Sequence, residues 1–282
     1  MTDNTQPGPG PHPVPDPAPP LPPGPQPDTP DPIPEIALID TAAIPASLAA
    51  GWRDFLRAPV FGLFFSAFYV AGGLVLAAVA AASGQEWWLM PFIVGFPLIA
   101  PFAAIGLFEV SRRLERGAPL DWPAILGVVL AQRKRQLPSM AMVVLLMFMF
   151  WVFVAHTIFA LFMGVSALTN VTSSPELLFQ GRGLVMLAVG CLVGAGFAAV
   201  LFSLTVVALP LLLEREVDFI SAMIASMTAV RLNLGVMLVW GLVIAACLFA
   251  GIAPLFLGLF VALPVLGHAS WHMYRHLMPD AE

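Results

Sequence analysis

The sequence predicts an all-α, polytopic membrane protein of about six transmembrane helices, built as three repeats of an interfacial helix plus a transmembrane hairpin. Composition, the lengths of the apolar runs and the placement of basic residues carry this prediction. Of the 282 residues, 59% are hydrophobic and only 10% are charged, and the mean hydropathy is +0.90. Because a soluble domain carries about 25% charged residues, this chain is suited to a surface that faces a bilayer.

The first 40 residues form a Pro-rich segment that we expect to be a disordered cytoplasmic tail. Residues 1–34 contain 15 prolines, which fix φ and remove N–H donors, and they offer almost nothing to bury. A solvated tail explains this composition, and the stretch Pro19–Pro23 also matches a PxxP ligand. No signal peptide is visible, so the first spanning helix is expected to act as the insertion signal.

Residues 41–278 form the predicted six-helix integral membrane domain. Crossing a hydrocarbon core about 30 Å thick takes about 20 helical residues. The bilayer core offers no water to backbone N–H and C=O groups, so the apolar runs must be helices. Gly251 and Pro254 separate the last two runs, which predicts a tight hairpin there. The six runs span residues 59–82, 89–111, 139–163, 184–209, 235–252 and 254–273.

Basic residues set the predicted orientation. With the N-terminus inside, all of the 12 Lys and Arg residues except Arg182 fall in the inner loops. This bias follows the positive-inside rule and predicts a bacterial inner-membrane protein with both termini in the cytoplasm. Since these cations are distributed along membrane edges, the lipid bilayer is their expected partner and nucleic acid is not.

Two further segments on the inner side have the pattern of amphipathic helices that lie in the membrane plane. Asp121 and Asp218 are the predicted N-caps, because each precedes an aromatic residue at the start of an apolar-periodic stretch. The second of these helices is expected to place its apolar side chains on one face. That predicted face contains Phe219, Ile220, Met223, Ile224, Met227 and Val230.

Similar pieces recur in the three hairpins and indicate an internal repeat. Pro101 precedes Leu114 by the same distance at which Pro264 precedes Leu277. A short turn introduces each hairpin. The three turns are Arg57-Ala58-Pro59, Gln136-Leu137-Pro138 and Asn233-Leu234-Gly235.

The last helix carries the residues that are most suited to binding a cofactor. His268, His272 and His276 follow one another at four-residue spacing and share one face near the cytoplasmic end. Imidazoles one turn apart can bind a transition metal such as copper, and one could ligate haem. Alignment of the repeats places Glu109 opposite His272, as a further metal ligand. The alternative is that this helix end only anchors at the headgroups, with no cofactor.

Two intramembrane polar residues allow both a functional and a structural interpretation. Glu109 is a functional candidate because ionisable groups in spans are costly, but Arg112 and Arg113 are close enough for a local ion pair. His156 on the third span is either a redox or proton ligand or a core histidine satisfied by its surroundings. Gly190 and Gly194 have the spacing that lets a neighbouring helix approach closely.

Four segments resemble the bacterial integral-membrane family called domain of unknown function 2189 (DUF2189). The resemblance covers roughly residues 40–278, and its most specific piece is Gly-His-Ala-x-Trp-His-x-Tyr-Arg near the C-terminus. Members of the family are sometimes labelled cytochrome c oxidase subunits, so the resemblance implies an association with a respiratory oxidase. The four segments are Gly51–Asp54 with Arg57–Pro59, Ser111–Gly117, Pro210–Asp218 and Gly267–Arg275.

The sequence favours a non-enzymatic accessory or assembly component of a membrane complex, such as a respiratory one. It contains no Walker, dinucleotide-binding, His-Glu-x-x-His, Cys-x-x-Cys or Gly-x-Ser-x-Gly motif. A small-solute transporter or channel is the alternative, because three hairpins with inner interfacial helices resemble mitochondrial carriers in outline. The carrier signature Pro-x-[Asp/Glu]-x-x-[Lys/Arg] is missing, however. Metal or haem binding is the third hypothesis.

Overall fold

The computed structural model describes residues 32–83, 90–164 and 180–279, without the side chains of residues 76, 80 and 83–100. The Pro-rich segment 1–31, with its PxxP stretch Pro19–Pro23, lies outside the described residues. The described residues form helices and contain no strand. The helices are α1 (Ala43–Arg57), α2 (Pro59–Ser83), α3 (Met90–Glu115), α4 (Trp122–Gln132), α5 (Leu137–Met163), α6 (Arg182–Thr205), α7 (Ala208–Glu214), α8 (Phe219–Leu232), α9 (Leu234–Ile252) and α10 (Leu259–Leu277).

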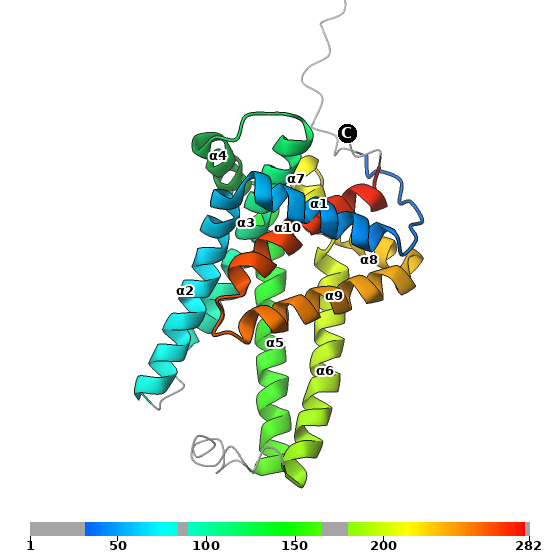
Figure 1. Ribbon diagram of the computed structural model, residues 1–282. Helices are drawn as coiled ribbons and strands as arrows, with labels where there is room; N and C mark the ends of the chain where they lie inside the picture. The colour runs from blue at the N-terminus through cyan, green and yellow to red at the C-terminus, as the bar shows by residue number, and fades with distance from the viewer. Residues whose placement is uncertain (1–31, 84–89, 165–179, 280–282) are drawn as a thin grey trace, which may run out of the picture. The chain divides into compact units, whose positions relative to one another are not determined.

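The order of the helices confirms the predicted fold class. A short helix followed by two longer ones occurs three times: α1 before α2 and α3, α4 before α5 and α6, and α8 before α9 and α10 (Figure 1). The two long helices of each set contact one another. Each set is therefore a hairpin introduced by a short helix, as the repeated turns predicted.

Four helices in the described part of the chain are long and apolar enough to cross a membrane: Pro59–Val79, Leu137–Met163, Arg182–Glu214 and Leu234–Ile252. The predicted run 89–111 lies on α3, where most side chains are outside the description. The predicted run 254–273 lies on α10, which is not among the four. Its first residues form a turn instead, and the later half of the helix is polar, so its apolar part is short.

The turn between α9 and α10 is as tight as predicted. A Cβ on Gly258 would stand 2.7 Å from the Cα of Gly251, so the two backbones touch and only glycine fits both positions. Leu255 and Phe256 adopt positive φ angles of 51° and 65° within this turn. The α9–α10 hairpin thus depends on Gly251, as expected, and on its unpredicted partner Gly258.

The predicted fourth span continues beyond its expected end but breaks between α6 and α7. Pro210 explains the break, because its ring lacks an N–H and clashes with the carbonyl four residues earlier, that of Val206. The N–H of Val207 instead donates to the hydroxyl of Ser226 on α8, at 3.1 Å. The proline and this serine together turn the end of the span toward α8.

Both predicted N-caps are confirmed, whereas the predicted apolar face of α8 is only partly buried. Asp121 accepts from the N–H of Ala124, and Asp218 from that of Ser221, each at 2.9 Å. On α8, Ile220 and Ile224 are exposed. The side that packs inward consists mostly of small residues: Ala222, Ala225, Ser226, Ala229 and Val230. Helices packed in lipid typically bury small residues and expose large apolar ones. Small side chains at the contact let the backbones of neighbouring helices come close together.

Helix α1 lies against α10 with almost no space between their backbones (Figure 1). A Cβ on Gly51 would come within 2.5 Å of the backbone N of Ala269 and 2.7 Å of the carbonyl O of Val265. No side chain larger than hydrogen fits there. This contact brings the next turn of α1, with Asp54, against α10.

Helices α5 and α6 run side by side as a long hairpin whose outer surfaces are largely uncovered (Figure 1). Leu161 and Leu192 are 78% and 76% exposed. Within the hairpin, Trp151 packs against Gly194, whereas Gly190 and Gly196 have no neighbour within 4 Å. Of the glycines predicted to permit close packing, Gly194 therefore does so, and Gly190 lies open.

The contact of α1 with α10 can be tested with Gly51→Ala. The added methyl group overlaps backbone atoms of α10, which cannot move aside, so we expect a loss of about 1–3 kcal/mol in unfolding free energy. Thermal unfolding in mild detergent measures this loss. Gly196→Ala is the matched control: its Cβ meets open space, and alanine is favoured over glycine inside a helix. Equal stability of Gly51→Ala and wild type would contradict the packing described.

Candidate functional site

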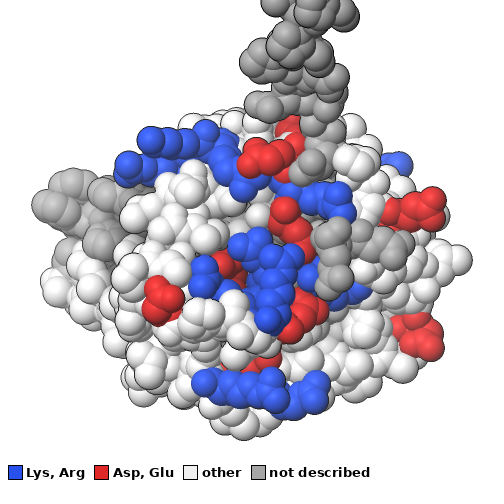
Figure 2. Space-filling model, turned by 90° about the horizontal axis from the view of Figure 1, so that it is seen from above, with Lys and Arg blue, Asp and Glu red and all other residues white. Residues whose placement is uncertain are grey.

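Charged side chains gather on the face of the molecule that carries α1, α4 and the end of α10 (Figure 2). Basic and acidic residues lie next to one another on this face rather than in separate patches. Six side chains at this end, four of them charged, connect the ends of α3, α7 and α10 and are together called the rim cluster here. They are Glu115, Arg116, Glu214, Trp271, Tyr274 and Arg275.

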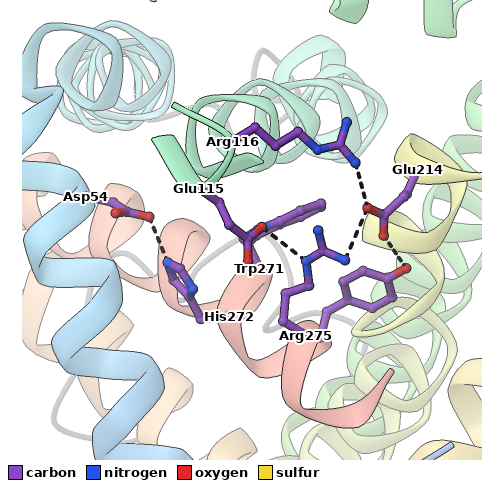
Figure 3. Close-up of polar contacts among 8 residues, drawn as sticks. Asp54, Glu115, Arg116, Glu214, Trp271, His272 and Arg275 are labelled. Atoms are coloured by element: carbon purple, nitrogen blue, oxygen red, sulfur yellow. Dashed lines mark hydrogen bonds and ion pairs between the residues drawn. The ribbon is translucent and has the colours of Figure 1, made fainter. Parts of the chain in front are cut away.

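Glu214, at the end of α7, is the centre of the rim cluster (Figure 3). Its carboxylate is only 4% exposed, and it pairs with Arg275 at 3.3 Å and Arg116 at 3.4 Å. The hydroxyl of Tyr274 donates to it at 2.8 Å. A buried carboxylate is tolerated only when its charge is compensated and its lone pairs are used. Arg116 and Tyr274 donate hydrogen bonds to the carboxylate and Arg275 adds an ion pair, so both requirements are met.

Arg275 connects Glu214 to a second carboxylate, that of Glu115 (Figure 3). Its Nε lies 3.1 Å from Glu115 Oε2, which also accepts from the indole N–H of Trp271 at 3.2 Å. The guanidinium lies over the Trp271 ring, 5.1 Å from the centroid, at a distance typical of cation–π contacts. The fork geometry of arginine lets one side chain join α3 to α7 in this way.

A second polar group connects α1, α3 and α10. The Nε2 of His272 lies 2.7 Å from Asp54 Oδ2 (Figure 3), and the hydroxyl of Ser111 lies 2.8 Å from Nδ1 of His268. Ser111 also helps to lower the pKa of Asp54, so its hydroxyl lies beside that carboxylate. Asp54, Ser111 and His268 are all buried. The four side chains therefore form a continuous polar chain from a partly exposed imidazole to a fully buried one.

The surroundings shift the pKa values of two groups at this end of the molecule. Burial by itself would raise the pKa of Asp54, but the hydrogen bond and charge of His272 outweigh it and hold that pKa below its usual value. Burial, helped by the negative charge of Glu214, raises the pKa of Tyr274. Tyr274 is therefore a neutral donor, and Asp54 a stable anion.

Three of the four residues proposed as metal ligands each have a different protein partner. Glu109 pairs with Arg112 and Arg113, at 2.5 and 2.7 Å, which is the local ion pair considered as its structural interpretation. His268 meets Ser111, and His272 meets Asp54. His276 is exposed.

Among the described residues, no group of three His, Cys, Asp or Glu side chains could hold a metal ion. The four candidates are thus not brought together as one ligand set among the described residues, and a metal or haem site remains a prediction from the sequence.

His156 lies on an exposed side of α5, outside the core. Its Nδ1 is 2.8 Å from the carbonyl oxygen of Val152 in the same helix. The neighbouring Thr157 donates to the carbonyl of Phe153 at 2.9 Å. Each of these side chains thus makes a hydrogen bond within α5, His156 through Nδ1, and both project from the uncovered hairpin.

Comparison with known families agrees with this architecture. The family model described as predicted integral membrane protein (DUF2189) matches residues 89–214. The resemblance to DUF2189 is confirmed over these residues. The chain is an integral membrane protein. No curated protein and no solved structure matches it.

The DUF2189 match runs from α3 to α7 and so includes half of the rim cluster: Glu115, Arg116 and Glu214. The other half lies on α10, in the Gly-His-Ala-x-Trp-His-x-Tyr-Arg segment. The four segments that carry the resemblance are thus distant in sequence but meet at one end of the molecule. Sequence reasoning missed this cluster, although Glu115 and Glu214 occupy similar Leu-Glu-Arg contexts at the ends of their spans.

Removal of the Glu214 charge should destabilise the fold. Glu214→Gln leaves Arg275 with only Glu115 as counter-charge and removes the carboxylate that Tyr274 and Arg116 bond to, so we expect a loss of about 1–3 kcal/mol in unfolding free energy. Glu216→Gln is the control, because Glu216 is 76% exposed where it pairs with Arg135, and surface pairs contribute about 0–1 kcal/mol. Thermal unfolding of both variants in the same detergent measures the difference. A similarly small effect of both substitutions would show that the Glu214 pairing stabilises the fold no more than a surface ion pair does.

The Asp54–His272 pair should stabilise the protein in a pH-dependent way. Since the folded pKa of Asp54 lies below its ordinary value of 3.8, its stabilisation is fully present above that value and is lost as the pH falls through the folded pKa. The difference in stability between wild type and Asp54→Asn should therefore shrink as the pH falls from about 5 into stronger acid. Unfolding midpoints across this range measure it. A difference that grows on acidification would contradict the pairing.

Proposed function

We propose that this integral membrane protein is a non-enzymatic accessory or assembly component, which holds another membrane protein against its α5–α6 hairpin. The observation that carries the proposal is the exposed His156 on a largely apolar, uncovered span. The rim cluster supplies the rigid base from which the hairpin projects. The partner is a transmembrane helix of another protein.

The charged end of the molecule supports a structural role rather than catalysis. In the rim cluster, two carboxylates and two guanidinium groups compensate one another, and each contact joins different helices. Charges used in this way fix helix positions and are not free to activate a substrate. The α5–α6 hairpin is connected to this base through α7, whose last residue is Glu214.

The hairpin supports docking because its polar groups face outward. A polar side chain within a span is costly in lipid and usually faces protein or water. The one described hydrogen bond of His156 uses Nδ1, so Nε2 can meet a partner. Because Trp151 packs against Gly194 in this antiparallel pair, His156 lies near the level of Gly190. Among the described residues, a Cβ on Gly190 would meet nothing within 4 Å, which leaves room there for the backbone of another helix.

The orientation and membrane that we propose follow the basic residues. The charged face, with the rim cluster and both ends of the described chain near it, would lie on the cytoplasmic side of a bacterial inner membrane. A respiratory oxidase, which the family label suggests, is the first partner to test. The transporter alternative gains no support from the cavity between the helices, because that cavity is lined almost entirely by apolar side chains.

Site-specific photo-crosslinking tests the docking proposal. A benzoylphenylalanine at Leu161 or Leu192, on the α5–α6 hairpin, should give adducts with another membrane protein in cells. The same group at Leu242 is the matched control, because this residue of α9 is also apolar and 70% exposed but lies off the hairpin. His156→Ala should reduce the hairpin adducts several-fold if the imidazole bonds to the partner.

The outcomes separate the alternatives. Adducts to a different protein at the hairpin but not at Leu242 support the proposal. Adducts only between copies of this chain would replace the accessory role with self-association. Adducts to lipid alone at all three positions would overturn the proposal. Respiratory subunits among the adducts would identify the complex.

A further inference from the structure

A cavity of about 270 Å³ lies between the first and third hairpins, where α2, α3, α9 and α10 meet. Its walls are mainly apolar, with Phe65, Leu107, Leu248 and Leu266 among them. The polar side chains that line it are Ser66, Tyr69 and Ser270. Two residues of the C-terminal motif, Gly267 and Ser270, line this space, but no pair of the rim cluster does.

We propose that the cavity binds an apolar chain, the acyl chain of a bilayer phospholipid. This inference is independent of the docking proposal, because the walls of the cavity contain no residue of α5 or α6. Two arguments support it: the cavity cannot be filled by water, and its walls lie at the depth of the bilayer.

The water argument rests on the count of polar partners. A volume of 270 Å³ would hold about nine waters at about 30 Å³ each, and each water needs two to four hydrogen bonds. The three polar side chains cannot supply them. Ser66 has already donated its hydroxyl hydrogen to the carbonyl of Gly62, at 2.8 Å. An empty apolar cavity of this size loses the dispersion contacts of its walls. An apolar occupant is therefore favoured over both water and an empty cavity.

The depth argument rests on the helices that form the walls. Phe65 and Tyr69 belong to the candidate span Pro59–Val79, and Leu248 to Leu234–Ile252. Lipid chains are therefore the immediate surroundings of this space. Leu248 and Leu263 are only half-buried, so this part of the wall is open toward the outside of the helices. A chain can enter there from the bilayer without passing the charged end.

The test uses a phospholipid with a diazirine in the middle of one acyl chain, added to the full-length protein in mild detergent. After illumination, digestion and mass spectrometry, we expect adducts on cavity residues such as Tyr69, Leu248 or Leu263. Ala104→Phe places a ring in the cavity and should reduce these adducts at least five-fold. Ala198→Phe is the matched control, since Ala198 is exposed on α6, and it should leave them unchanged.

A competition experiment keeps the test decisive if Ala104→Phe does not fold. Excess unlabelled phospholipid should remove adducts at the cavity of the wild-type protein, because a single site saturates, while adducts on the outer face of α5–α6 persist. Equal loss at both places, or no cavity adduct, would overturn the site. If a diazirine fatty acid labels the cavity and phospholipid does not compete with it, a free fatty acid replaces the phospholipid as ligand.

Discussion

The pairing of Glu214 with Arg275 and Arg116 is the interaction on which the arrangement of the three hairpins depends. Glu214 lies at the end of the second hairpin. Its partners Arg116 and Arg275 lie at the ends of the first and the third hairpin. Without this pairing, a charge would be buried alone at the point where α7 meets α3 and α10, at a cost of several kcal/mol. The apolar contacts below this point are non-directional and could be satisfied by many arrangements, whereas the ion pairs require one.

Close backbone contact works together with these polar contacts. Gly51 lets α1 touch α10, and Asp54 on the next turn then reaches His272. Helices in lipid gain little from burying large apolar side chains, because lipid tails are equally apolar. Small residues at contact points and polar pairs at the charged end are therefore the main means of fixing their positions. The exposed isoleucines of α8 and its buried alanines follow the same principle.

The two proposals assign different work to different parts of this scaffold. The first and third hairpins contact one another around the apolar cavity, which suits a lipid chain. The second hairpin contributes its end to the rim cluster but leaves most of its length uncovered. A polar residue at His156 on that uncovered length is what distinguishes a surface for a protein partner from one that merely faces lipid.

The sequence by itself determined the class of the protein, its hairpin plan and its caps. Run length and hydropathy reflect the thickness of the bilayer directly, and an Asp before an aromatic caps a helix through contacts only three residues apart, so neither needs tertiary information. The tertiary structure alone decided which polar residues meet. The spacing of His268, His272 and His276 indicated a shared face, yet the packing of α1 and α3 against α10 gives the first two separate partners. Glu115 and Glu214 are 99 residues apart (214 − 115), and only the packing of helix ends brings both to Arg275.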